Sequence, residues 1–294
     1  MIGRTDVEEA ARRIEGRIRR TPLVEAAPGL WFKLEYLQHA GSFKTRGMMN
    51  RILAAQERGE LPAAGIVVAS GGNAGLAAAY AARELGIPVE VFVPVTAPPV
   101  KVAKLGKLGA RVVQVGNEYA EAYEAARSVE NALFCHAYDD PDMVAGNGTI
   151  GLEISGESDR VLVAVGGGGL LAGVIAALKG RAEIVAVEPE NSRAFHEALK
   201  NEGPTDVTVG GVAADSLGAR RAGDIAFELA TGAGIATTLV TDEEIVEARR
   251  RLWDEYRIVV EHGTAAAYAA YRPEGNRQTV VLLCGANTNP ADLG

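Results

Sequence analysis

The sequence predicts an α/β protein of two open, mainly parallel α/β lobes whose strand ends face a shared cleft. Two observations carry this prediction. Short runs rich in β-branched residues alternate with helical segments that have one apolar face, which is the pattern of parallel sheets covered by helices on both faces. The alternation also occurs twice, before and after a break near residues 138–154.

The first half of the chain begins with a helix and continues with the β–α alternation. A capping box at residues 5–8 (TDVE) is predicted to open the first helix, and WFKLEYL is predicted to be a strand. A second helix is predicted after GSFKTRG, with Ser42 as its N-cap. Three β–α pairs follow in order: IVVAS with GLAAAYAAREL, VEVFVP with VKVAKLGKLG, and RVVQV with NEYAEAYEAARSVE.

The second half repeats this pattern after the break. The strand VLVAV leads into four glycines and a helix, and the strand EIVAVE leads into the amphipathic segment SRAFHEALK. A capping box at residues 241–244 (TDEE) is predicted to open a further helix, and TVVLLC is predicted to be the last strand.

Composition excludes several classes of function. The 294 residues are 48% hydrophobic and 23% charged, which suits a large core in two domains or in one domain with an inserted lobe. A net charge of −8 argues against nucleic acid or an anionic membrane as the main partner. The N-terminus lacks the apolar core of a signal peptide, no apolar run approaches about 20 residues, and we therefore expect a cytoplasmic protein. Cys135 and Cys284 lack metal-binding spacing, and the four histidines are scattered.

The segment GSFKTRG presents an electrostatic anomaly. It places Lys44 and Arg46 in the first turn of a predicted helix, where the helix dipole favours anions over cations. A lysine at such a position needs an explanation, and composition alone does not supply one.

Four consecutive glycines, residues 166–169, stand between a strand and a helix. Their bare N–H groups point at whatever lies at the helix N-terminus, which predicts a phosphate-binding loop. A tight turn with positive φ is the alternative, although one or two glycines would satisfy it. A dinucleotide site is a second alternative, because Gly167, Gly169 and Ala172 match G-x-G-x-x-A and Glu188 ends the next strand about 20 residues on.

Two further segments are candidates for a binding site. Residues 70–75 (SGGNAG) also join a strand to a helix, so their N–H groups could hold a carboxylate, and Asn73 could fix an oxygen on a bound ring or substrate. The alternative is a helix start capped by Asn73. Cys284 ends the last strand, where it is either a small core residue or a group that faces the cleft.

Six segments in order resemble the serine/threonine dehydratase family, which includes serine racemase. These pyridoxal-phosphate enzymes have the tryptophan-synthase-β fold, with the cofactor in the cleft between the lobes. The segments are RTPLVEA, KLEYLQHAGSFKTRGMMN, SGGNAGLAAAYAARELGIPVEVFVP, HAYDDPDMVAGNGTIGLEI, VAVGGGGLLAGV and VVLLCGAN. The resemblance covers nearly the whole chain. It implies a large cofactor-binding domain of residues 1–52 and 139–294 and a small domain of residues 53–138.

The resemblance implies pyridoxal 5′-phosphate as the cofactor and Lys44 as the lysine that binds it. Lys44 would hold the cofactor as a Schiff base and, once displaced by the substrate, would take the Cα proton. Burial and a helix N-terminus both disfavour the ammonium, which suits a lysine that must act as an amine. Arg46 is expected to form an ion pair or a contact across the lobe boundary, without a catalytic role.

The remaining site residues are implied motif by motif. Phe43 would lie along the cofactor ring, Asn73 would contact its phenolic oxygen, and Cys284 would lie beside its pyridine nitrogen. The phosphate would bind Gly166, Gly167, Gly168, Gly169 and the N–H of Leu170. The substrate carboxylate would bind the loop of Ser70, Gly71, Gly72, Asn73 and Ala74.

Departures from the family pattern narrow the expected activity. Racemases of the group have a second serine where this chain has Gly71, which argues against racemisation as the main activity. Ala74 and Cys284 agree with the mammalian-type serine dehydratases. Glu188 stands at the first acid of the family's divalent-cation site, but its later acidic partner is Ala194 here, so no metal site is expected. The regulatory domain of biosynthetic threonine dehydratases is not expected either.

The sequence therefore predicts a pyridoxal-phosphate-dependent ammonia-lyase acting on L-serine, L-threonine or a related 3-hydroxy amino acid. Alternatives within the fold are an amino-acid racemase and a threonine or cysteine synthase. A nicotinamide-dependent dehydrogenase and a ligand-binding relative without activity are alternatives from other classes. A homodimer is expected from the resemblance alone.

Overall fold

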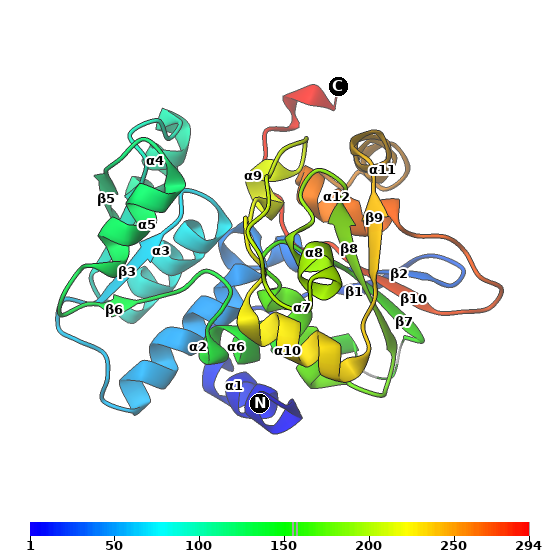
Figure 1. Cartoon of the computed structure of the whole chain (residues 1–294). Coiled ribbons are helices and arrows are strands. Elements are labelled where there is room, and N and C mark those ends of the chain that lie inside the picture. The colour runs from blue at the N-terminus through cyan, green and yellow to red at the C-terminus, as the bar shows by residue number, and fades with distance from the viewer. Residues whose placement is uncertain (155, 157, 294) are drawn as a thin grey trace.

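The computed structural model, which describes residues 1–154, 156 and 158–293, consists of two lobes, each built on its own sheet (Figure 1). The larger sheet has six strands in the order β1-β2-β10-β7-β8-β9, and the smaller has four in the order β5-β4-β3-β6. All neighbouring strands run parallel except β1 and β2. The predicted fold of two open, mainly parallel α/β lobes is confirmed.

The strands are short and rich in valine and other branched residues, as expected for sheets buried on both faces. The larger sheet contains β1 (Leu23–Ala27), β2 (Leu30–Lys33), β7 (Arg160–Ala164), β8 (Glu183–Pro189), β9 (Thr237–Val240) and β10 (Thr279–Leu282). The smaller sheet contains β3 (Ile66–Ala69), β4 (Val89–Val93), β5 (Arg111–Gln114) and β6 (Leu133–Phe134). All four residues of β3 and of β10 are buried.

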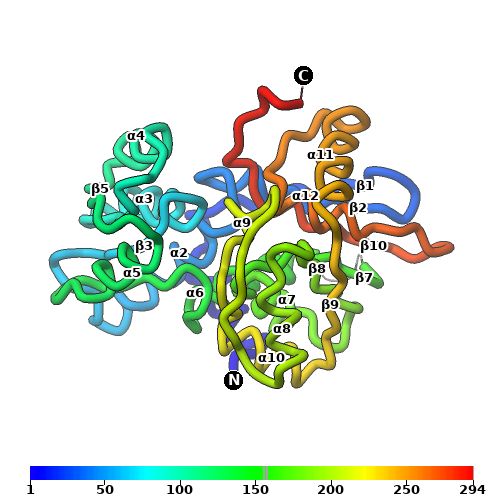
Figure 2. The backbone as a smooth tube through the Cα atoms, turned by 45° about the horizontal axis from the view of Figure 1, so that its top comes forward, coloured from blue at the N-terminus to red at the C-terminus, as the bar shows by residue number. Residues whose placement is uncertain are grey.

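Helices cover both sheets. The small lobe has α3 (Asn73–Leu85), α4 (Pro99–Lys107) and α5 (Tyr119–Arg127). The large lobe has α1 (Arg4–Ile14), α6 (Pro141–Ile154), α7 (Gly169–Leu178), α8 (Ala194–Lys200), α9 (Ala214–Leu217), α10 (Asp224–Ala233), α11 (Asp242–Tyr256) and α12 (His262–Ala269). Helix α2 (Lys44–Glu57) packs against both α6 and α3. The short 3-10 turns are η1 (Glu35–Leu37), η2 (His39–Gly41) and η3 (Pro290–Asp292). Figures 1 and 2 both place α2 and α6 between the two lobes.

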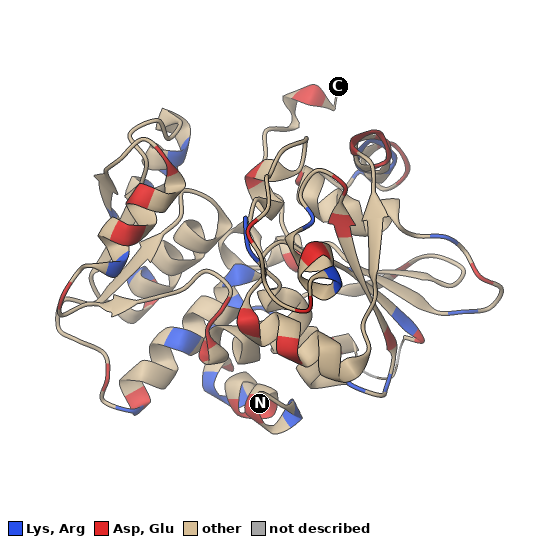
Figure 3. Cartoon of the chain, viewed as in Figure 1, with Lys and Arg blue, Asp and Glu red and all other residues tan. Residues whose placement is uncertain are grey.

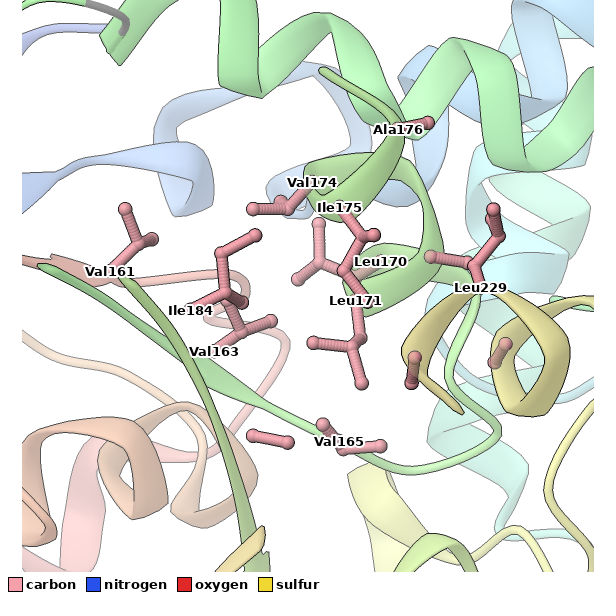
Figure 4. Packing of buried hydrophobic residues seen from close by; sticks show 14 of the residues in the cluster. Val161, Val163, Val165, Leu170, Leu171, Val174, Ile175, Ala176, Ile184 and Leu229 are labelled. Atoms are coloured by element: carbon pink, nitrogen blue, oxygen red, sulfur yellow. The ribbon is translucent and has the colours of Figure 1, made fainter. Parts of the chain in front are cut away.

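The core of the large lobe lies between its sheet and helix α7. Val161, Val163 and Val165 of the β7 region face Leu171 and Ile175 of α7 in Figure 4, and all five residues are buried. Because α7 is apolar on every side, its remaining faces pack against α6 and α10. This packing fixes the N-terminus of α7, where the four glycines lie.

Charged residues of both signs are interspersed over the two lobes in Figure 3. Among the described residues, no helix combines the length and the apolar character needed to cross a membrane.

Several local predictions need correction. The capping box at residues 5–8 is wrong, because α1 begins at Arg4 with Gly3 as N-cap and Asp6 accepts the N–H of Gly3. Ser42 does not cap α2, because Phe43 is the N-cap residue and the buried Ser42 Oγ has no hydrogen-bond partner among the described residues. The predicted strand WFKLEYL ends at Lys33 and continues as the turn η1. The capping box of Thr241 and Glu244 is confirmed by both of its hydrogen bonds.

The break near residues 138–154 contains helix α6, which the sequence did not reveal because three glycines interrupt it. These glycines allow close helix packing. A Cβ on Gly146 would lie 2.8 Å from Cα of Gly47 in α2, and a Cβ on Gly148 would lie 2.7 Å from the carbonyl oxygen of Gly173 in α7. The glycines lower the helix propensity of α6, but they allow it to pack closely against α2 and α7.

A buried ionic cluster anchors α2 to the large lobe. The guanidinium of Arg46, which is fully buried, donates to Glu35 at 2.7 Å and to Glu153 at 2.6 Å. Lys33 pairs with Glu153, and the hydroxyl of Thr21 donates to Glu35. The expected ion pair of Arg46 is confirmed, and its carboxylates come from η1 and α6 of the large lobe.

Replacing Arg46 by methionine should destabilise the protein strongly. The substitution leaves Glu35 buried without its main partner, which costs about 3–5 kcal/mol in free energy of unfolding. Urea denaturation followed by circular dichroism measures the change. Arg58→Met is the matched control, because Arg58 pairs with Glu60 and Asp142 at the surface and should cost about 0–1 kcal/mol. Equal losses in both variants would contradict the proposed anchoring role.

Candidate active site

The site is assembled where the chain before α2 meets the end of β10. The N–H of Phe43 donates to the carbonyl of Cys284 at 3.0 Å, and the N–H of Ala286 donates to the carbonyl of Gly41 at 3.0 Å. Ser42 forms an antiparallel bridge with Gly285 between these two bonds. Segments separated by about 240 positions are thereby held side by side, with Lys44 next to Cys284.

Lys44 is the first residue of α2, and its amine contacts the segment that joins β6 to α6. Nζ donates to the carbonyl oxygen of Ala137 at 2.6 Å and lies 5.0 Å from the centroid of the Phe43 ring. Burial lowers the pKa of the Lys44 ammonium to about 8, against a small opposing effect of Cys284. About half of the Lys44 population is therefore a neutral amine near pH 8.

Cys284 lies near this amine, and its thiol stays protonated. The thiol is buried and lies 3.2 Å from the hydroxyl of Thr264, which donates to the carbonyl of Gly285 and accepts the N–H of Gly285. Burial raises the pKa of the Cys284 thiol to about 12, with the hydroxyl of Thr264 acting in the opposite direction. The group offered to a ligand here is a neutral thiol held by Thr264.

The tetraglycine loop, residues 166–170, presents an open set of backbone donors at the N-terminus of α7. The N–H groups of these five residues donate to no acceptor in the described part of the chain. Gly168 has φ +91°, and a Cβ there would lie 2.4 Å from Cβ of Ala226. A Cβ on Gly167 would lie 2.4 Å from the ring of Tyr138. Glycine is required by both backbone conformation and space, so the tight-turn alternative accounts for Gly168 but leaves the five free donors unexplained.

The second loop, residues 70–74, also presents unpaired backbone N–H groups, at the N-terminus of α3. The hydroxyl of Ser70 accepts the N–H of Gly72 at 3.2 Å. The N–H groups of Gly71, Asn73 and Ala74 have no acceptor among the residues that the structure describes. Three free donors at a helix N-terminus suit a carboxylate. The role of Ser70, Gly71, Gly72, Asn73 and Ala74 as the substrate-carboxylate loop stays a prediction.

Asn73 ties this loop to the large lobe. Its amide nitrogen donates to both carboxylate oxygens of Glu261, at 3.0 and 2.9 Å, and its Oδ1 accepts from the amide of Asn287 at 2.6 Å. Asn73 therefore does not cap α3 with its side chain. Its predicted contact with a phenolic oxygen remains untested, and Glu261 and Asn287 fix the amide in one orientation.

Several site residues were missed by the sequence analysis. The carbonyl of Ala137 holds the Lys44 amine, Glu261 and Asn287 orient Asn73, and Thr264 holds the Cys284 thiol. Asn287 belongs to the quoted motif CGAN, so its position was a usable signal. Ala137 acts through its backbone and carries no signal in its side chain.

Residues 71–73 of the second loop line a small cleft that an ion pair crosses. The cleft is lined by Gly71, Gly72, Asn73, Leu76, Lys101, Lys104, Asp215, Ser216, Glu261 and Asn287. Lys101 of α4 in the small lobe pairs with Asp215 of α9 in the large lobe. The predicted loop and the CGAN segment therefore share one cleft between the lobes.

Glu188 does not support the dinucleotide alternative. Its side chain is fully buried, and its two oxygens accept the N–H groups of Phe195 at 2.8 Å and His196 at 2.7 Å. Burial raises the pKa of Glu188 to about 8, although these two N–H groups act against it. The carboxyl group serves the start of α8 and is not free to hold a ribose. In the described ranges, no group of three or more His, Cys, Asp or Glu side chains could hold a metal ion.

Comparison with known proteins identifies the group of enzymes that this arrangement resembles. A family model described as pyridoxal-phosphate dependent enzyme matches residues 14–285. An L-threonine ammonia-lyase of Thermotoga maritima is 36% identical over 98% of this chain and 76% of its own. A phenylserine dehydratase of Ralstonia pickettii is 35% identical over 95% of this chain and 91% of its own. The structure of the processed form of a threonine deaminase from Solanum lycopersicum superposes with a TM-score of 0.89 at 26% identity, covering 99% of this chain and 85% of its own.

Adding one methyl group at Gly168 should disable the tetraglycine loop. Gly168→Ala places a Cβ at positive φ and against Ala226, so the loop must shift and its donors lose their common direction. Affinity for pyridoxal 5′-phosphate, titrated by absorbance on the apoprotein, should fall at least tenfold. Gly106→Ala in α4 is the control, because a Cβ there meets nothing within 4 Å. Unchanged affinity in Gly168→Ala would show that the loop is not the phosphate site.

The amine of Lys44 should react at lower pH than an ordinary lysine. Below about pH 8 it is protonated and unreactive, and above that pH it is a free nucleophile. Pulse acetylation of the apoprotein followed by peptide mass spectrometry should give a labelling rate at Lys44 that rises through about pH 8. A midpoint near 10.5, the ordinary value for lysine, would show that burial does not act on this group.

Proposed function

Because the chain belongs to the serine/threonine dehydratase family of pyridoxal-phosphate dependent enzymes, we propose that its cleft converts a 3-hydroxy amino acid to a 2-oxo acid and ammonium. L-serine, L-threonine and related compounds are the candidate substrates. The net change balances, because the water lost from C2 and C3 is regained when the product enamine hydrolyses and releases ammonium. The chain is a pyridoxal-phosphate-dependent ammonia-lyase. The roles of its individual site residues are proposals.

One observation supports the proposal, namely that groups suited to the parts of this cofactor lie around Lys44, which is linked to them through Ala137, Tyr138 and Cys284. Five unpaired N–H groups of residues 166–170 suit a phosphate dianion, and the glycines leave no side chain in its way. Lys44 supplies an amine that is neutral near pH 8, and Phe43 supplies a ring beside it. Cys284 lies close to Lys44, where a ring nitrogen would be met by a neutral thiol. These residues would hold pyridoxal 5′-phosphate.

The remaining residues prepare the substrate for loss of its Cα proton. The N–H groups of Gly71, Asn73 and Ala74 bind the substrate carboxylate and fix the position of Cα. Lys44 Nζ takes the proton from Cα, for which its lowered pKa makes it a suitable base. When bound, the cofactor supplies an electron-withdrawing ring that stabilises negative charge at Cα. The carbonyl of Ala137 keeps the amine of Lys44 in the cleft between proton transfers.

Two features favour elimination over racemisation in this proposal. Cys284 would place a neutral thiol beside the ring nitrogen of the cofactor, and the ring would then withdraw electrons from Cα less strongly than it would beside a carboxylate. This suits a reaction in which the 3-hydroxyl group departs promptly. Gly71 has no side chain that could deliver a proton from the face opposite Lys44. We further propose a large domain of residues 1–52 and 139–294, a small domain of residues 53–138, a homodimer, and a cytoplasmic location.

Replacing Lys44 should abolish the reaction. Lys44→Ala removes the group that takes the Cα proton, so release of 2-oxo acid and ammonia from L-threonine and L-serine should fall by at least a factor of about 10³. A coupled 2-oxo acid assay and an ammonia assay measure the loss. Lys107→Ala, at an exposed position on α4, should retain the activity of the parent protein.

The same assay separates the proposed lyase from its relatives. Release of 2-oxo acid without any second substrate distinguishes an ammonia-lyase from a replacement enzyme such as a threonine or cysteine synthase. Full activity of Lys44→Ala would remove Lys44 from the mechanism.

A further inference from the structure

Five aromatic rings form a continuous cluster beside the reactive lysine, and none of the roles proposed above uses it. The aromatic cluster consists of Tyr119 and Tyr123 of α5, Phe134 of β6, and His136 and Tyr138 in the segment that follows β6. Its ring centroids are 6.0 Å apart for Tyr119 and Tyr123, 5.9 Å for Tyr123 and His136, and 4.7 Å for His136 and Tyr138. These spacings and the mostly edge-to-face orientations are those of favourable aromatic contacts.

The aromatic cluster borders the reacting groups on one side. The segment between β6 and α6 crosses from the small lobe to the large lobe (Figure 1). The carbonyl of Ala137, between two of the rings, accepts the hydrogen bond of Lys44 Nζ at 2.6 Å. The ring of Tyr138 lies on Gly167, where a Cβ would be 2.4 Å from it. The cluster therefore reaches from α5 past the Lys44 amine to the tetraglycine loop.

The polar atoms of the inner rings are engaged within the protein. His136 Nδ1 accepts the N–H groups of Tyr138 at 3.3 Å and Asp139 at 2.8 Å, and the hydroxyl of Tyr138 donates to the carbonyl of Arg221 at 3.1 Å. Burial lowers the pKa of His136, and the charge of Lys44 adds to this effect although Asp139 opposes it. A neutral His136 that accepts at Nδ1 carries its proton on Nε2, and its ring packs against Tyr123, Phe134 and Tyr138.

Tyr119 is the open end of the cluster. It retains 51% exposure, whereas Tyr123 and Tyr138 are partly buried. Its ring contacts that of Tyr123, and burial of the hydroxyl, followed by Tyr138 and Tyr123, raises the pKa of Tyr119. A half-exposed ring at the first position of α5 is costly in water and can be covered by a further apolar group.

The substrate itself brings such a group to this place. Lys44 Nζ must approach Cα, and the substituent on C3 is only two bonds away from Cα. The small cleft beside the loop of residues 70–74 is charged, because Lys101, Lys104 and Asp215 line it. An apolar substituent is disfavoured there and favoured against the rings.

Resting on the proposed function, we propose that the aromatic cluster is the subsite for an aryl group on C3 of the substrate. Tyr119 and Tyr138 are its specificity-determining residues, and 3-phenylserine is the matching substrate class. The enzyme would convert 3-phenylserine to phenylpyruvate and ammonium, with the same balance of water as for the other 3-hydroxy amino acids.

The test compares 3-phenylserine with L-threonine on the holoenzyme. The parent protein should have a kcat/KM at least tenfold higher for 3-phenylserine. Tyr119→Ala should lower the ratio of the two kcat/KM values at least tenfold, mainly by raising KM for the aryl substrate, because the ring that covers the aryl group is lost. Tyr119→Phe should keep the ratio, since the proposal uses the ring and not the hydroxyl. Tyr271→Ala, on the large lobe outside the cluster, is the control and should also keep the ratio.

Inhibition supplies a second readout that does not depend on turnover. L-phenylalanine and L-alanine carry no 3-hydroxyl and cannot undergo elimination, so their competitive inhibition constants report binding alone. L-phenylalanine should bind at least tenfold more tightly to the parent protein, and Tyr119→Ala should remove this difference.

The outcomes separate failure of the inference from failure of the proposed function. Turnover of L-threonine or L-serine with little or no turnover of 3-phenylserine would overturn the aryl subsite and leave the ammonia-lyase intact. An unchanged ratio in Tyr119→Ala would also overturn it. Turnover of none of the three compounds would overturn the proposed function and the inference with it.

Discussion

The pairing of residues 41–43 with residues 284–286 is the constraint on which the site depends. Two backbone hydrogen bonds join these distant segments, and they are possible only where the last strand of the large sheet ends beside the start of α2. The position of Lys44 relative to Cys284 is therefore set by main-chain geometry and not by flexible side-chain contacts. The ionic cluster of Arg46 holds α2 from the opposite side, and the glycine-rich face of α6 brings α2 and α7 together. The N-termini of α2 and α7 in the site are thus fixed.

Lys44 and Arg46 show how the same charge can have opposite consequences within one helical turn. Both groups lose solvent, which disfavours a cation. Two carboxylates offset this desolvation for Arg46, which stays charged and holds α2 in place. Among the described residues Lys44 has no ion pair, so its ammonium is not compensated, and burial lowers its pKa to about 8. The anomaly of two cations at a helix start is resolved by the presence or absence of carboxylate partners.

Sequence patterns predicted the order of the strands and helices better than their local boundaries. The strand and helix order and the open tetraglycine loop follow from periodicity and from free N–H groups at helix starts, which are local properties. The role predicted for Lys44 comes from the resemblance to the family. Helix α6 was missed because Gly146, Gly148 and Gly151 lower helix propensity, and the reason for their presence lies in two neighbouring helices that are distant in sequence. Ser42 was misread as a cap because its backbone is used for the bridge to Gly285.

The unpredicted parts of the site share one cause, which is that they act across the fold. Ala137 contributes a carbonyl to Lys44, and Glu261 orients Asn73 from 188 positions away. The aromatic cluster is formed by three separate segments of the chain, so no single sequence motif predicts it. The scattered histidines looked structural, and His136 does serve its own segment by accepting two N–H groups. Its ring nevertheless lies beside the reactive amine.

The central claim, that the Lys44 amine holds the cofactor in this cleft, is tested most directly by borohydride reduction of the holoenzyme followed by peptide mass spectrometry. The account predicts a yellow protein that bleaches on reduction and carries one stoichiometric mass increment of the reduced cofactor on the peptide containing Lys44. A colourless protein without the increment, or an increment on another lysine, would contradict it.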